Sequence, residues 1–190
     1  MRIISKGEAM TDDQLYRQFL AGDQSAGDRL MLRYSDALTA YLDGFLHNAE
    51  DAEDLMLECF TVILVKKPTI AEGCFRAYLF KTARNKANHL WRIRFSRQEF
   101  SLDEDIESSK DSPEDAVWNK ELNVILQRCL NRIAPQYREA LWLYYFMDMS
   151  YEQSANILGC NIKKVDNLLN NGKNRLRAEL EKEGVTHAEI

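Results

Sequence analysis

The sequence contains few of the residues that break helices, with only three prolines and eight glycines among its 190 residues. Long stretches carry apolar residues at a 3.6-residue period, and none shows the sustained alternation of a strand, so we predict an all-α protein. No apolar run approaches the roughly 20 residues of a membrane span, and membrane insertion is not expected. The first ten residues also lack the apolar segment of a secretory signal, which favours a cytoplasmic protein.

Cysteine and histidine are also scarce, and their spacing argues against two classes of site. The four cysteines are widely scattered, and the three histidines have no neighbours at metal-ligand spacing. Disulfides and a structural zinc site are therefore not expected. The sequence also lacks a Ser-His-Asp set and a phosphate-binding glycine loop. We expect no catalytic residues, no metal and no cofactor.

Charge is segregated along the chain, although its net value is only −5. From Arg76 to Arg97 there are seven basic residues and no acidic one, whereas from Glu99 to Asp115 eight acidic residues accompany Lys110 alone. High charge and low hydrophobicity predict an acidic linker at 98–116, between helical domains at 11–97 and 117–183. Because the chain as a whole is acidic, any contact with nucleic acid must come from local basic patches.

Residues 150–179 have the pattern of a helix-turn-helix. Ser150 and Gln153 fit a capping box at the first helix, and Gly159 fits the position after it that favours positive φ. In the second helix one stripe is predicted to be buried: Ile162, Val165, Leu169, Gly172 and Leu176. The outer face carries residues suited to base edges and phosphates: Lys163, Lys164, Asn167, Asn170, Asn171 and Asn174. A plain helical hairpin with a polar outer face is the alternative.

A basic helix is predicted from Phe75 to Trp91 or beyond. One arc of it combines cations and amides, with Trp91 at its margin. Such a face suits DNA because cations neutralise phosphates and an aromatic ring stacks on an unpaired base. The alternative makes Trp91 a core residue and the basic residues a solvated face. The residues of this arc are Lys81, Arg84, Asn85, Asn88 and Arg92.

Three further helices are predicted before it, at 12–21, after Gly22, and at 51–65. The first has Thr11 as its candidate cap. The last places Asp51, Asp54 and Glu58 on its outward side. These carboxylates could be metal ligands, a solvated face or a docking surface for a basic partner.

Taken together, these segments resemble the extracytoplasmic-function (ECF) sigma factors of bacterial RNA polymerase. The resemblance covers nearly the whole chain, in the family's order. AGDQSAGDRLMLRYSDALTAYL is similar to the opening helices, EDAEDLMLECF to the polymerase-binding helix, and FRAYLFKTARNKANHLWRIR to the helix that melts and recognises the minus-ten element. LNRIAPQYREALWLYYFMDMSYEQSANILG with KKVDNLLNNGKNRLR resembles the domain that recognises the minus-thirty-five element.

The resemblance implies an initiation subunit that binds core RNA polymerase and promoter DNA and leaves the chemistry to polymerase. It implies polymerase binding by Asp51, Asp54, Leu55 and Glu58, minus-ten contacts by the arc around Arg84 with Trp91, and minus-thirty-five contacts by the outer face of the final helix. Whether an anti-sigma factor inhibits the chain stays open. Two alternatives remain: a helix-turn-helix regulator that acts without polymerase, and a helical hydrolase with a metal bound by the three carboxylates.

Overall fold

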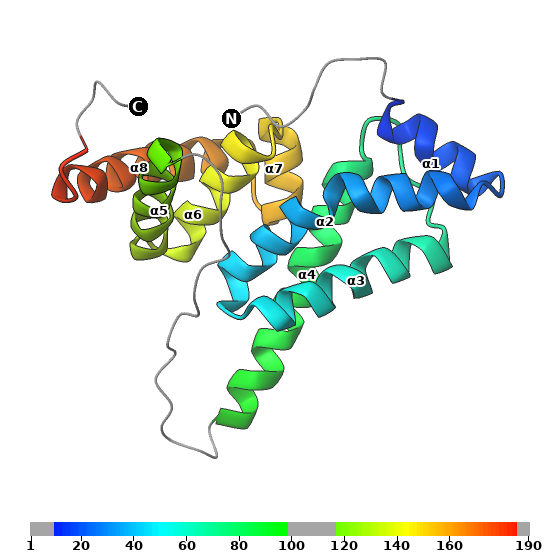
Figure 1. Cartoon of the computed structure of the whole chain (residues 1–190), viewed down its shortest axis with the longest axis horizontal. Helices are drawn as coiled ribbons and strands as arrows, with labels where there is room; N and C mark the ends of the chain where they lie inside the picture. Colours follow the sequence, from blue (N-terminus) through cyan, green and yellow to red (C-terminus); the bar gives the residue numbers. More distant parts are fainter. Residues whose placement is uncertain (1–9, 99–116, 186–190) are drawn as a thin grey trace.

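The computed structural model describes residues 10–98 and 117–185, and for 94–98 and 117–123 it describes the backbone alone (Figure 1). Every regular element within these two ranges is helical, which confirms the predicted fold class. Apart from Gln98, the predicted acidic linker lies outside the described residues. The elements are α1 (Asp12–Leu20), α2 (Gln24–Leu46), α3 (Ala49–Lys66), α4 (Phe75–Gln98), α5 (Val117–Arg132), α6 (Pro135–Leu141), the π-helical turn η1 (Trp142–Phe146), α7 (Tyr151–Leu158) and α8 (Ile162–Lys182).

Local capping determines where the first three helices begin. The Thr11 hydroxyl accepts a hydrogen bond from the backbone N–H of Gln14, and the Gln14 side chain accepts one from the backbone of Thr11, so the predicted cap of α1 is a full capping box. Asp23 caps α2 and Asn48 caps α3 with one side-chain bond each, in which the side-chain oxygen accepts from the backbone N–H of Ser25 and of Asp51. These bonds satisfy N–H groups that the first turn of a helix leaves unpaired.

The core of the N-terminal part lies between α2, α3 and α4, with α1 packed across one end. Helical spacing places Leu30, Tyr34, Leu38, Tyr41 and Phe45 on one stripe of α2, and all are buried except Phe45 at its end, which is only half-buried. Phe80 of α4 meets the ring of Tyr41 edge-on, with 5.2 Å between ring centroids. The fully buried side chains of this core include Leu15, Leu30, Leu38, Leu42, Phe60, Ile63, Leu79 and Phe80.

The C-terminal helices have a core of their own and also share the first one. Leu141, Val165 and Leu169 are buried between α6, α7 and α8. Leu143 of η1 and Ile157 of α7, however, belong to the N-terminal core cluster. Figure 1 accordingly shows α7 lying beside α4, between the N-terminal helices and the group formed by α5, α6 and α8. The two helical parts are thus packed against each other. Among the described residues no helix is both long and apolar enough to cross a membrane.

Candidate nucleic-acid interface

The helix-turn-helix is formed by α7, a three-residue turn and α8, as predicted. At the start of α7, Ser150 and Gln153 make a reciprocal capping box, with bonds of 3.1 and 3.0 Å. Gly159 ends the helix in the left-handed region, at a φ of 67°. Asn161 then caps α8, where its side-chain oxygen accepts a 2.8 Å hydrogen bond from the backbone of Lys164. The turn is therefore defined by local bonds on both sides.

The inward stripe of α8 matches the prediction at three residues, is only partly buried at Leu176 and differs at Ile162. Val165, Leu169 and Gly172 are buried as expected, but Ile162 is 48% exposed, so its assignment to the stripe is wrong. At 100° per residue the buried arc centres near Val165 and Gly172, which leaves Ile162 at the edge and brings in Leu168 instead. Gly172 permits this close packing, since a Cβ there would lie 3.2 Å from Cγ of Leu141.

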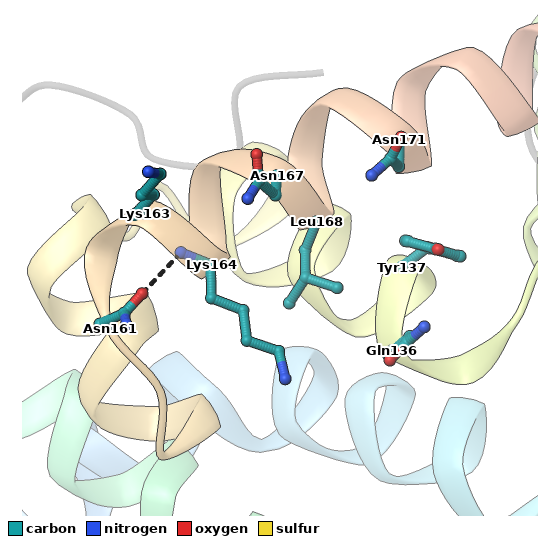
Figure 2. Close-up of a pocket in the computed structure, with 8 residues that line it drawn as sticks. All are labelled: Gln136, Tyr137, Asn161, Lys163, Lys164, Asn167, Leu168 and Asn171. Atoms are coloured by element: carbon teal, nitrogen blue, oxygen red, sulfur yellow. Dashed lines mark hydrogen bonds between the residues drawn. The ribbon is translucent and has the colours of Figure 1, made fainter.

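The outer face of α8 is open to solvent. All six predicted contact residues on it are exposed. Beside this face, a hollow of about 460 Å³ lies between α8 and the start of α6. Figure 2 shows Lys164 and Leu168 extending into it, with Gln136 and Tyr137 of α6 across from them. Arg175 lies over the Tyr137 ring at 5.0 Å from its centroid. Cations, amides and one aromatic ring are thus gathered on a single accessible surface, which is the composition suited to nucleic acid.

The distal half of the α4 arc is also accessible. Asn85 and Arg92 are exposed, and Asn88 is half-buried. Trp91 is 54% exposed, so the alternative that places its ring in the core is wrong. An indole with this exposure can stack on an unpaired base, and the neighbouring cations and amides suit the strand that carries it.

The proximal half of the arc is occupied by the C-terminal helices. Arg84 forms an ion pair with Glu139 of α6, with 2.6 Å between Nε and Oε1. The Lys81 ammonium donates to the side-chain oxygen of Asn156 on α7. Nothing in the sequence marks Glu139 or Asn156 as partners of a helix more than 50 residues earlier, and sequence reasoning missed both.

Burial gives the Arg84–Glu139 pair an unusual setting. Glu139 is only 6% exposed, and its carboxylate also accepts a 2.8 Å hydrogen bond from the hydroxyl of Tyr41. Desolvation lowers the pKa of Arg84, but the hydrogen bond and charge of Glu139 outweigh it and raise that pKa above its ordinary value. Burial, with the Glu139 charge added, raises the pKa of Tyr41 well above its usual range. Arg84 therefore stays charged and Tyr41 stays a donor.

The carboxylates predicted for polymerase binding lie on α3 in different settings. Asp54 is exposed, and Asp51 lies in the first turn, where an acid favours the helix dipole. Glu58 forms an ion pair with Lys86 of α4 at 2.8 Å. Leu55 is 7% exposed and packs in the N-terminal core, on the side of α3 that faces away from solvent. No cluster of three or more potential metal ligands occurs within 10–98 or 117–185.

Comparisons with known proteins agree with this arrangement. The family profile of sigma-70 region 4 matches residues 123–176. The chain is 26% identical to the RNA polymerase sigma-H factor of Pseudomonas aeruginosa, over 81% of this chain and 86% of that protein. It is 31% identical to the ECF RNA polymerase sigma factor BldN of Streptomyces coelicolor, over 78% of this chain and 58% of that protein.

A solved structure with a similar fold is that of the sigma factor RpoE of Bartonella quintana, determined in complex with the anti-sigma factor NepR. Its TM-score is 0.70 at 25% sequence identity, covering 81% of this chain and 96% of that one. Each of these three similarities spans about four fifths of the chain, well beyond the part matched by region 4.

Proposed function

The chain is an ECF sigma factor, a non-catalytic subunit that directs transcription initiation by RNA polymerase, and we propose that it binds core polymerase through α3 and promoter DNA through α4 and α8. The observation that carries the assignment of surfaces is the exposed amide-rich face of α8, held on a capped helix-turn-helix. Its place of action is the cytoplasm, where polymerase works. An anti-sigma factor is a further proposed partner, supported by the similarity to RpoE, which was solved with NepR.

On α8, the exposed asparagines approach base edges of the minus-thirty-five element. An asparagine side chain can accept a hydrogen bond from the N6–H₂ group of adenine and donate one to adenine N7, whereas lysine favours guanine or phosphate. Asn167, Asn170, Asn171 and Asn174 therefore favour an adenine-rich element. Lys163 and Lys164, near the start of the helix, contribute phosphate contacts or a neighbouring guanine.

On α4, the arc around Arg84 meets the minus-ten region. Lys81, Arg84 and Arg92 hold phosphates, Asn85 and Asn88 approach bases, and Trp91 supports the opened strand. This assignment is supported by the exposure of Trp91 and by the absence of acidic residues from Arg76 to Arg97. Binding two promoter elements with one chain makes the second contact intramolecular, which raises selectivity through effective concentration.

Transcription in vitro tests the function directly. Core polymerase would be combined with the purified chain and a library of genomic promoter fragments, and transcripts would be sequenced. We expect initiation from a small set of promoters that share two elements and that core polymerase alone does not use. A chain that binds DNA fragments but neither joins polymerase nor starts transcripts would instead be a regulator of the helix-turn-helix class.

Polymerase docking by α3 has a sharper test in charge reversal. Asp54→Lys should weaken retention of the chain by immobilised core polymerase, because it places a cation on the proposed docking face. Glu53→Lys is the matched control, since Glu53 is also exposed on the same helix but points about 100° away from Asp54. Both variants should keep the wild-type fold, because exposed charges contribute little to stability. Equal retention of both variants and wild type would rule out this face.

A further inference from the structure

We infer that the C-terminal helices of the free chain close over the proximal half of the α4 arc, and that the Glu139 carboxylate occupies the place on Arg84 that a promoter phosphate takes. The inference rests on the proposed function of α4. It adds a partner to that surface, namely the chain's own α6 and α7, and it makes DNA binding depend on their release.

Three basic side chains of α4 are engaged by the C-terminal part of the chain at once. Arg84 is bound by both carboxylate oxygens of Glu139, at 2.6 and 3.4 Å. Lys81 donates to Asn156, and Arg76 donates to the backbone carbonyl of Asp148 at 2.9 Å. We call these three interactions the closed contact. They engage the basic residues at the start of the arc, with Arg84 mostly buried and Lys81 still exposed, and they leave Asn85, Trp91 and Arg92 accessible, so the contact is confined to the proximal half.

The chemistry of the Arg84–Glu139 pair is that of phosphate recognition. A guanidinium binds carboxylate and phosphate alike, through parallel N–H donors directed at two acceptor oxygens. Arg84 uses its Nε and Nη2 donors on Glu139, so these donors are not available to DNA in the closed form. Glu139 is in turn held by the Tyr41 hydroxyl, which fixes the carboxylate in place from the side of α2. Phosphate and Glu139 therefore compete for one binding position.

Opening the closed contact is costly, because apolar surface moves with it. Leu143, Met149 and Ile157 come from the C-terminal part and are buried in the N-terminal core cluster. Separation would expose them together with the Glu139 carboxylate. A short stretch of DNA would have to provide all of this free energy alone, whereas polymerase can provide it by binding the open form better.

The position of α3 fits this order of events. Asp54, on the proposed docking face, is exposed while the closed contact is intact. Polymerase can therefore bind α3 before the C-terminal helices are displaced, and α4 becomes fully available only afterwards. The closed contact thus restricts promoter recognition to the chain that has already joined polymerase.

The test measures binding of the free full-length chain to a labelled single-stranded oligonucleotide by fluorescence anisotropy. The oligonucleotide carries the minus-ten element of a promoter identified in the transcription experiment. Glu139→Gln removes the competing charge, and Asn156→Ala removes the Lys81 partner without altering a buried group. Glu181→Gln is the matched control, because it makes the same charge change at an exposed residue near the end of α8.

We expect Glu139→Gln to bind the oligonucleotide about tenfold tighter than wild type or more, since a larger fraction of chains is competent. Asn156→Ala should show a smaller gain, and Glu181→Gln none. In assembled holoenzyme the Glu139→Gln and wild-type affinities should be equal, because the contact is already broken there. Small-angle scattering of the free variants supplies a readout of closure without DNA, and Glu139→Gln should have a larger radius of gyration than wild type.

Two results would overturn the inference. One is a folded Glu139→Gln or Asn156→Ala chain that is no more expanded and binds no more tightly than Glu181→Gln. The other is an expanded chain whose affinity for the oligonucleotide is unchanged, since the covered face would then not be the DNA face. If Glu139→Gln does not fold, Asn156→Ala alone decides. Failure of the proposed function is detected separately, as loss of promoter-specific transcription by the wild-type holoenzyme.

Discussion

Two glycines of α2 should respond in opposite directions to the same substitution. Gly27→Ala would place a Cβ 2.9 Å from Cδ2 of Phe19 and 3.3 Å from Cδ2 of Leu64, and Phe19 is itself only 3% exposed. Gly44→Ala would meet nothing within 4 Å. Alanine in place of a helical glycine stabilises by about 0.5–1 kcal/mol when there is room. Overpacking a buried site costs about 1–3 kcal/mol.

Because both positions lie within one helix, the gain in helix propensity nearly cancels when the variants are compared. The difference between their free energies of unfolding should therefore equal the overpacking term, about 1–3 kcal/mol in favour of Gly44→Ala. Urea denaturation of the two variants and wild type, followed by circular dichroism, measures it. A Gly27→Ala chain as stable as Gly44→Ala would show that α1 moves freely against α2 and that the close approach to Phe19 is not a constraint.

Three other outcomes are expected. Asn170→Ala should relax the preference at one adenine of the upstream element by about 5- to 150-fold, whereas Lys163→Ala should weaken binding to all sites alike and reduce the salt dependence of binding by about one unit of slope. Selection of randomised upstream elements with holoenzyme distinguishes these two effects. A strong consensus without adenine would mean that another face of α8 meets the groove. Trp91→Ala holoenzyme should open promoters less completely than wild type in permanganate footprinting, and full opening would remove the indole from the melting mechanism. Burial raises the pKa of the Cys59 thiol to about 12, so above about pH 8.5 the folded chain keeps a proton that the unfolded chain loses. The free energy of unfolding should therefore be unaffected below that pH and fall by up to about 1.4 kcal/mol per pH unit as pH rises toward 12. Denaturation at pH 7 and pH 10 should show a smaller fall in the free energy of unfolding for Cys59→Ala than for wild type.

The features that local sequence determines were predictable. The capping boxes at Thr11 and Ser150 require only residues three apart, and the left-handed end at Gly159 requires only a residue without a Cβ. The stripe of α2 follows from helical periodicity, because one face of that helix is buried along nearly its whole length. Such features depend on the chain within a few turns, and the structure agrees with them.

The features that depend on distant packing were not predictable. Ile162 fits the stripe of α8 by spacing alone, but Leu168 is the residue that packs with Leu141 of α6 and Ala155 of α7, and Ile162 is left exposed. Glu139 was unremarkable in sequence because a charged residue beside apolar ones is usually the solvated side of a helix. Its burial arises only when the C-terminal part packs on the N-terminal helices, which brings Glu139 to Tyr41 of α2 and Arg84 of α4, and no periodicity within any one helix specifies that contact.

The sharing of one core by both halves of the chain has a consequence for how the protein can be divided. Leu143, Met149 and Ile157 fill space in the N-terminal cluster. A fragment that ends before α5 would keep all of α1 to α4 and still carry an apolar opening on its surface, and exposed patches of this kind promote self-association. A second protein surface that covers these exposed apolar residues would prevent the self-association. Dissection of this protein should therefore retain η1 and α7 or supply a partner in their place, because the shortest piece that contains the basic helix is not the shortest piece that stays monomeric.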